Sequence, residues 1–432
     1  MVAPILKKSY WALAVLGGIW ATLLACAIHP TAQSHLVYMH KLHHGYFQNV
    51  KNPEEFGFAK GQVTPFWLET IDGEKLFCWH VLPLDVYLEH ERELVSSVQA
   101  DVVESGEFKR TLGARLLRED GEGRVVVNFH GNAGHVALGW RPSIYRSMSG
   151  IPHTHTLVCD YRGFGISTAN NEPHLPTETG LITDGISIVS FVLNELQHPA
   201  SRTILLGQSL GTAVTAATAL YFTDPDSALL PTDLVRPEVA AKAPQHFAGV
   251  ILAAAFTDLP TLLKTYKIKG IVPILSPLQN YPKIANFLSA RIIDTWPTLA
   301  RLRALITAAT SSSTPFHITI LHARNDQEFP FQIAETVYSP LETLMLAEEG
   351  ASSVSERRSI QGGERVQRGA FAYRKVETKE GERTVEVEVV RYGGHSEGVG
   401  WGQVSLAVRR AWRRVEGGWG KGVEGEYSGD EI

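Results

Sequence analysis

The chain has 432 residues, enough for one large α/β domain with insertions or for two ordinary domains. Its content of hydrophobic residues (44%) and charged residues (20%) is that of a globular protein. The net charge of −5 offers no surface for a polyanion, so we expect no nucleic-acid partner. Its 3 cysteines are too few for a disulfide framework, and we expect Cys26 and Cys159 to be packing residues.

The N-terminus carries an uncharged run from Tyr10 to Ile28, preceded by Lys7 and Lys8. As a helix this run is roughly 28 Å long, close to the ~30 Å hydrocarbon core of a bilayer. We therefore expect a transmembrane anchor over residues 1–30, with its N-terminus in the cytoplasm. A cleaved signal peptide is the alternative, because residues 25–27 (Ala-Cys-Ala) resemble a cleavage site. Both interpretations place the rest of the chain at a membrane of the secretory pathway, such as the endoplasmic reticulum.

The next segment, residues 31–60, contains His35, His40, His43 and His44. A metal site is one interpretation of this histidine group. We favour a membrane-proximal arm, because no carboxylate stands at a spacing that suits a ligand. We expect neither a metal nor an organic cofactor in this chain.

From residue 61 the chain alternates between apolar runs and helical patterns, which predicts an α/β domain over residues 61–415. Alternating patterns at 66–68 and 75–82 predict antiparallel strands, and the charged residues 86–122 predict a surface excursion. Further strands are expected at 125–129, 156–159, 204–206, 247–253, 316–321 and 384–390, with a helix over 177–196. Strands separated by helices favour a mostly parallel, doubly wound sheet.

Several segments interrupt this alternation. Residues 222–246 are rich in Pro and Asp and predict a loop, whereas residues 259–300 are apolar enough to form a cap. The mixed charge of residues 347–383 predicts a mobile insert. An amphipathic helix is expected from Val404 to Val415, followed by a disordered, glycine-rich tail over 416–432.

The central motif is Gly207-Gln208-Ser209-Leu210-Gly211, which fits the G-x-S-x-G pattern. The apolar strand 204–206 precedes it, and small, helix-compatible residues follow it. A strand, a one-residue corner and a helix form a nucleophile elbow, which holds the corner serine at the carboxyl edge of the sheet. A side chain at either flanking glycine should collide with a neighbouring strand or helix. We therefore predict that Ser209 is a nucleophile.

A serine nucleophile needs a histidine base, and the histidine needs a carboxylate that orients it. The loops after the last two expected strands contain Asp326 and His395, in the order that α/β-hydrolases use. Glu328 is a rival for the acid but lies further into its loop, so we favour Asp326. His322 lies closer to the strand, and we expect it to be a core residue.

The tetrahedral intermediate needs preorganised N–H donors. We expect the backbone N–H groups of Leu210, just after the nucleophile, and Asn132, at an earlier strand end, to form this oxyanion hole. The turn 163–165 should shape the loop beside the site, with Arg162 as its anchor. His135 is expected at the surface and receives no role.

The motifs at 130–134, 160–165, 207–211, 322–330 and 394–395 occur together and in order. This set resembles the membrane-anchored α/β-hydrolase-domain proteins that act as monoacylglycerol and lysophosphatidylserine lipases, and the N-terminal anchor matches as well. The resemblance covers roughly residues 60–345 and 384–412, whereas the charged insert and the glycine-rich tail depart from it. It implies an α/β-hydrolase fold, a lipid or acyl-ester substrate and a location at a membrane.

The predicted function is therefore ester hydrolysis through an acyl-enzyme, with Ser209, Asp326 and His395 as the catalytic triad. The cap beside a membrane anchor suggests that the acyl chain enters from lipid. Two alternatives stay open at this point. The same triad could cleave acyl or protein thioesters, or peptides, and the same fold could serve as a non-catalytic scaffold. The sequence carries no signal for an oligomeric state.

Overall fold

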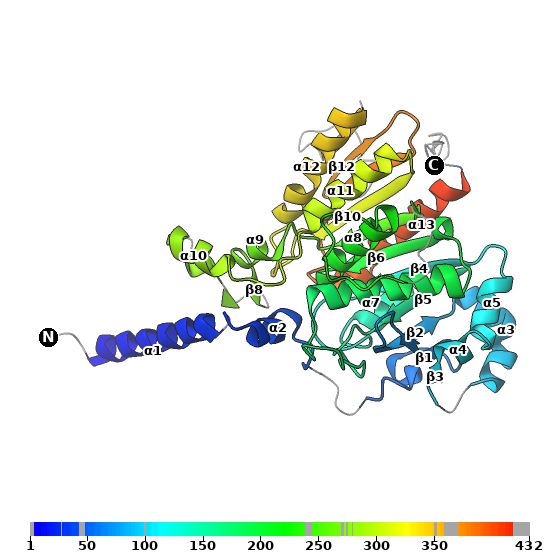
Figure 1. Ribbon diagram of the computed structural model, residues 1–432, viewed down its shortest axis with the longest axis horizontal. Coiled ribbons are helices and arrows are strands. Elements are labelled where there is room, and N and C mark those ends of the chain that lie inside the picture. Colours follow the sequence, from blue (N-terminus) through cyan, green and yellow to red (C-terminus); the bar gives the residue numbers. More distant parts are fainter. Residues whose placement is uncertain are drawn as a thin grey trace, which may run out of the picture.

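The structure is a computed structural model (Figure 1). It describes residues 4–26, 28–42, 48–98, 101–237, 244–268, 272–273, 275–278, 280–349, 352–357 and 370–417. The expected tail over 416–432 therefore lies almost wholly outside the described residues, as do His43 and His44.

A single large sheet organises the chain, in the strand order β11-β12-β13-β10-β7-β6-β4-β5-β2-β1-β3. Its strands are β1 (Val63–Glu69), β2 (Lys75–Val81), β3 (Val103–Glu104), β4 (Arg124–Phe129), β5 (Thr154–Cys159), β6 (Thr203–Gln208), β7 (Gly249–Ala253), β10 (Phe316–Ala323), β11 (Ser352–Arg357), β12 (Ala372–Glu377) and β13 (Arg383–Val390). The six strands from β13 to β5 run parallel, and antiparallel strands extend the sheet on both sides. The predicted parallel core is thus confirmed.

Helices cover both faces of this sheet, and a small group of elements forms the cap. The helices are α1 (Pro4–Cys26), α2 (Pro30–Tyr38), α3 (Leu84–Ser96), α4 (Ser105–Phe108), α5 (Leu112–Glu119), α6 (Arg141–Ser149), α7 (Glu178–Ser190), α8 (Leu210–Thr223), α9 (Leu259–Leu263), α10 (Pro282–Ser289), α11 (Thr298–Ser311), α12 (Gln332–Glu349) and α13 (Gly402–Glu416). In the cap, α9 and α10 flank a two-stranded ribbon of β8 (Lys267–Ile268) and β9 (Val272–Pro273).

Alternate side chains of each central strand enter two separate cores, as the pleat of a strand requires. In β4, Val125 and Val127 pack into the core that α7, α8, α11 and α12 cover. Val126, between them, packs into the opposite core, which α6 and α13 cover. Burial on both faces explains why these strands are continuous apolar runs in the sequence.

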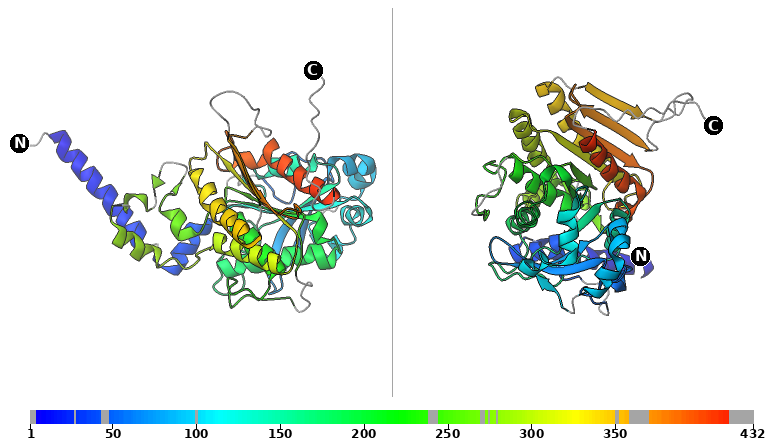
Figure 2. Two further views of the ribbon diagram at one scale, coloured as in Figure 1. Left: turned by 90° about the horizontal axis from the view of Figure 1, so that it is seen from above. Right: turned by 90° about the vertical axis from the view of Figure 1, so that its right-hand side faces the viewer.

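The first helix extends away from the body of the molecule (Figures 1 and 2). A transmembrane anchor was expected here. In the described part of the chain, however, no helix has both the length and the apolar character needed to cross a membrane.

The charged insert over 347–383 also differs from the expectation of a mobile segment. Its described parts include β11 and β12, which pair antiparallel and join the sheet beside β13. A strand near the sheet edge can keep polar side chains, so its composition resembles that of a loop. The charged excursion over 86–122 likewise contains α3, α4 and α5.

The prediction for Cys159 was wrong. Cys78 on β2 and Cys159 on β5 form a disulfide across 81 residues of sequence. The two residues are direct partners in the antiparallel register of these strands. A count of cysteines does not reveal such a pair, because the pairing depends on which strands become neighbours.

Candidate active site

Ser209 occupies the sharp turn between β6 and α8, with backbone angles of φ 52° and ψ −120°. A Cβ atom on Gly211 would lie 2.0 Å from the carbonyl oxygen of Phe129, and one on Gly207 would lie 2.4 Å from Oγ1 of Thr215. Both positions therefore require glycine, as the sequence predicted. The strained turn presents the serine at the carboxyl edge of the sheet.

The side chains of Ser209, His395 and Asp326 lie in contact. Nε2 of His395 is 3.0 Å from Oγ of Ser209, and Nδ1 of His395 is 2.8 Å from Oδ2 of Asp326. Asp326 follows β10 and His395 follows β13, and these neighbouring parallel strands end at the same edge. The amide of Gly394 donates to Asn325, which joins the two loops.

The electrostatic surroundings favour an ionised Asp326. Burial alone would raise the pKa of this carboxyl group, but hydrogen bonds from His322 and His395 and from the amide of Phe329 outweigh it. The pKa of Asp326 is therefore well below its ordinary value. For His395, burial lowers the pKa, but the hydrogen bond and negative charge of Asp326 raise it more, so its pKa lies above the ordinary value.

The rival residues occupy different positions. Glu328 lies 3.9 Å from Nε2 of His395, on the side that faces the serine, and it accepts a hydrogen bond from Tyr266. It does not occupy the orienting position at Nδ1, where Asp326 lies. His322 is buried, as predicted, and its Nε2 lies 3.5 Å from Oδ2 of Asp326.

Asn132 and Leu210 line the same cavity as Ser209. A Cβ atom on Gly131 would lie 3.4 Å from Cβ of Ser209, so the backbone of this loop passes directly beside the serine. The two residues whose N–H groups were expected to form the oxyanion hole thus lie close to Ser209. His135, expected at the surface, is instead 8% exposed, and its carbonyl oxygen accepts a hydrogen bond from the buried Arg141.

No family model matches the sequence. Among curated proteins, the lysophosphatidylserine lipase ABHD12 of Danio rerio is 22% identical over 332 residues, covering 76% of this chain and 70% of that protein. The same lipase of Mus musculus is 22% identical over 339 residues, covering 77% and 71%. An α/β-hydrolase crystal structure from Vibrio vulnificus covers 90% of this chain and 94% of its own, with a TM-score of 0.52 and 13% identity. The chain has the α/β-hydrolase fold and is an ester hydrolase.

The hydrolase has an apolar cavity of ≈ 180 Å³ that reaches Ser209. The cap contributes Leu259, Leu262 and Tyr266 to its wall, and α2 contributes Leu36 and Val37. The arm expected over 31–60 therefore includes part of the site itself. Sequence reasoning missed this role of α2, since nothing in its pattern indicates where the helix docks.

Polar contacts fix α2 against the hydrolase body. Gln33 donates to the carbonyl oxygen of Arg291 in the cap (2.7 Å), and the hydroxyl of Tyr38 donates to Asp294 (2.6 Å). The carbonyl oxygen of Tyr38 accepts from the amide of Ala133 (2.8 Å), which is next to Asn132. One helix thus contacts both the cap and the loop expected to hold the oxyanion.

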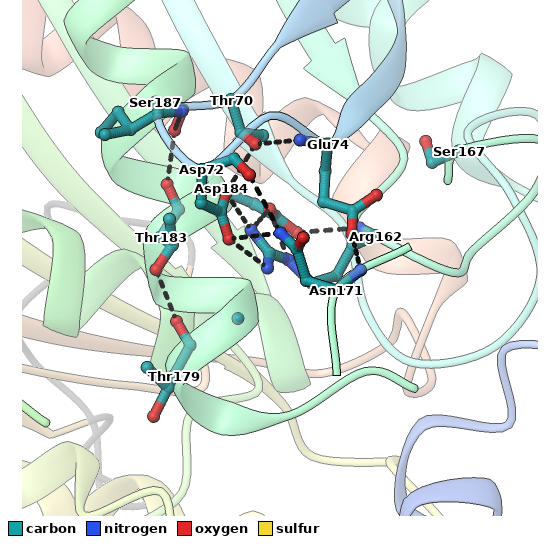
Figure 3. Close-up of polar contacts among 12 residues, drawn as sticks. Thr70, Asp72, Glu74, Arg162, Ser167, Asn171, Thr179, Thr183, Asp184 and Ser187 are labelled. Atoms are coloured by element: carbon teal, nitrogen blue, oxygen red, sulfur yellow. Dashed lines mark hydrogen bonds and ion pairs between the residues drawn. The ribbon is translucent and has the colours of Figure 1, made fainter. Parts of the chain in front are cut away.

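Arg162 anchors the adjacent loop, as expected, through the buried network in Figure 3. Its guanidinium donates to Asp184 on α7 at 2.7 and 2.9 Å and to Asp72 at 2.7 and 2.9 Å. The turn that follows places Phe164 against the rings of Tyr38 and His130. This loop therefore supports α2 and the strand end that precedes Asn132.

Within the described residues, no group of three His, Cys, Asp or Glu side chains is arranged to hold a metal ion. His35 stacks on the ring of His40 with centroids 5.0 Å apart. The groups available for chemistry at this edge of the sheet are those of acyl transfer: a serine hydroxyl, an imidazole and a carboxylate.

Proposed function

We propose that this hydrolase cleaves the carboxylic esters of single-chain lipids, monoacylglycerols or lysophospholipids, through an acyl-enzyme on Ser209. The observation that carries the proposal is the contact of Ser209 with His395 at the end of an apolar cavity. An apolar wall suits an acyl chain, and the polar residues gathered at one end suit the ester group. The relatives named as lysophosphatidylserine lipases point to the same substrate class.

The proposed reaction begins when Nε2 of His395 takes the proton from Ser209 and the oxygen attacks the ester carbonyl. The N–H groups of Asn132 and Leu210 would stabilise the negative oxygen of the tetrahedral intermediate. Asp326 holds the histidine tautomer that carries the proton on Nδ1 and stabilises the imidazolium. His395 then protonates the leaving alcohol, and water cleaves the acyl-enzyme by the same route.

We further propose that the hydrolase works at a membrane surface of the secretory pathway, where its lipid substrate resides. The described part of α1 exposes a dense set of apolar side chains, each more than half exposed: Leu6, Trp11, Leu13, Leu16 and Ile19. Exposed apolar surface of this kind marks a site of protein or lipid contact. The helix leads to α2, whose residues line the cavity.

A fluorophosphonate probe tests the nucleophile directly. The wild-type protein should be labelled, whereas Ser209→Ala should not, and its kcat should fall on the order of 10⁶-fold. Ser311→Ala, an exposed serine on α11, is the matched control and should behave as wild type. Labelling that persists in Ser209→Ala would overturn the assignment of the nucleophile.

The substrate class is tested by comparing long-chain monoacyl lipids with short, soluble esters. Because the cavity is apolar, kcat/KM should rise with acyl length. Equal rates on both would contradict a lipid substrate while leaving the proposed ester chemistry intact.

A further inference from the structure

Arg141, the first residue of α6, lies directly behind the loop that carries Asn132. Its side chain is 7% exposed. Nη1 donates to the carbonyl oxygen of His135 at 2.6 Å, and Nη2 lies within 2.8 to 2.9 Å of the carbonyl oxygens of Gly131, Asn132 and Ala133. One guanidinium thus contacts four carbonyl groups within a single turn of the chain.

These contacts determine where the N–H groups of the loop point. In a planar trans peptide, the C=O and N–H groups point in opposite directions. The carbonyl of Asn132 faces Arg141, and the N–H of Ala133, in the same peptide, points away from it and donates to Tyr38 at 2.8 Å. The carbonyl of Gly131 also faces Arg141. The N–H of Asn132, in that peptide, must therefore point away from Arg141.

The position of Arg141 is unfavourable by the usual rules for helices and for buried charge. A cation in the first turn of a helix is opposed by the helix dipole. A buried guanidinium usually has a carboxylate partner, yet among the described residues no carboxylate forms an ion pair with Arg141. Burial raises the pKa of the nearby Asp160 although the charge of Arg141 opposes this shift, and its carboxyl group accepts no hydrogen bond from the guanidinium. The hydrogen-bond partners of Arg141 are therefore the four carbonyl oxygens of the loop.

We propose that Arg141 is a positioning residue for catalysis. Its guanidinium fixes the carbonyls of residues 131–133, so that the N–H of Asn132 is aimed at the developing oxyanion, and its charge adds to the positive potential there. This inference rests on the proposed function for the oxyanion role of Asn132. Preorganised dipoles and charges of this kind act on the transition state more than on the bound substrate.

The kinetic test uses Arg141→Lys, which keeps the charge but loses the planar fork, and Arg141→Gln, which loses both. The kcat of each variant should fall roughly 10- to 100-fold with KM changed by no more than about twofold, because a transition-state interaction is lost. The affinity for a trifluoromethyl ketone, which forms a tetrahedral adduct on the serine, should fall by the same factor as kcat/KM. Arg146→Lys, an exposed arginine on the same helix, is the control.

A second measurement does not depend on activity. Hydrogen exchange of peptides covering residues 131–138 should accelerate in Arg141→Lys and remain unchanged in Arg146→Lys. If Arg141→Gln does not fold, Arg141→Lys carries the test, and guanidinium ion at sub-denaturing concentration should restore kcat in Arg141→Ala. Unchanged exchange, or a kcat within about twofold of wild type, would overturn the proposal. A wild-type protein with no hydrolase activity would refute the proposed function, and the exchange result would still decide whether Arg141 orders the loop.

Discussion

At the scale of single residues, the environment of His395 sets the conditions under which the site can work. In the proposed mechanism, His395 must be neutral to accept the proton of Ser209, and the Asp326 carboxylate 2.8 Å from Nδ1 raises the pKa of His395. A raised pKa means that protonated histidine, which cannot act as the proposed base, persists to higher pH. Activity should therefore rise with pH as His395 loses its proton.

This relation predicts the effect of Asp326→Asn. Without the negative charge, burial dominates and the pKa of His395 falls, so the acidic limb of the kcat/KM profile should move to lower pH. The plateau should also fall, by roughly 10⁴-fold, because the amide favours the wrong tautomer. A pH–rate profile of both proteins measures the two effects. If the acidic limb of the kcat/KM profile lies at the same pH in both proteins, a group other than His395 controls it.

The residues proposed for the triad are those with local signals in the sequence. A strand followed by G-x-S-x-G points to Ser209, and the loops after two later strands point to Asp326 and His395, whose side chains lie in contact with one another and with the serine. Arg141 carries no such signal, since an arginine at the start of an amphipathic helix is expected at the surface. Its role depends on the path of the preceding loop, which sequence alone does not give.

At the scale of elements, α1 and α2 connect the exposed apolar surface of α1 with the cavity that reaches Ser209. Trp20 of α1 packs near Leu275, Leu278 and Ala285 of the cap, and Leu36 of α2 lines the cavity. The docking of α2 was not predictable, because hydrogen bonds such as that from Gln33 to the cap join residues 258 positions apart. The edge strand β11 was missed for a different reason: its polar sequence resembles a loop.

The proposed membrane contact predicts the behaviour of a double variant, Leu13→Glu with Leu16→Glu. These side chains are 69% and 62% exposed, so the change should not disturb the fold. It should weaken binding to phosphatidylcholine vesicles by roughly tenfold or more, since two apolar side chains proposed to enter the lipid are replaced by charged ones. Flotation measures binding, and hydrolysis of a soluble ester should be unaffected. Leu88→Glu, on the remote α3, is the control, and equal loss with that variant would refute a specific role for α1.

At the scale of the whole molecule, the sheet was predictable from apolar runs, but its outer connections were not. The disulfide between Cys78 and Cys159 joins the antiparallel part of the sheet to the parallel core. It closes a long loop in the unfolded chain and therefore lowers the conformational entropy of the unfolded state, which stabilises the folded protein.

The double variant Cys78→Ser with Cys159→Ser should unfold at a lower temperature than the oxidised wild type. The expected loss is about 2–4 kcal/mol, typical of a native disulfide. Calorimetry with and without a thiol reductant measures it. The reductant should lower the unfolding temperature of the wild type and leave that of the double variant unchanged. Equal unfolding temperatures for all forms would contradict a stabilising disulfide.

The placement of α2 bears on how this protein can be prepared. Removing the first 40 residues, a common step when an apolar leader hinders purification, would also remove Leu36, Val37 and the backbone partner of Ala133. The shortened enzyme would have an opened apolar cavity and a loosened loop at residues 131–133. A low kcat measured on such a fragment would then result from the truncation itself. A shortened protein should therefore retain Ile28 and all residues after it.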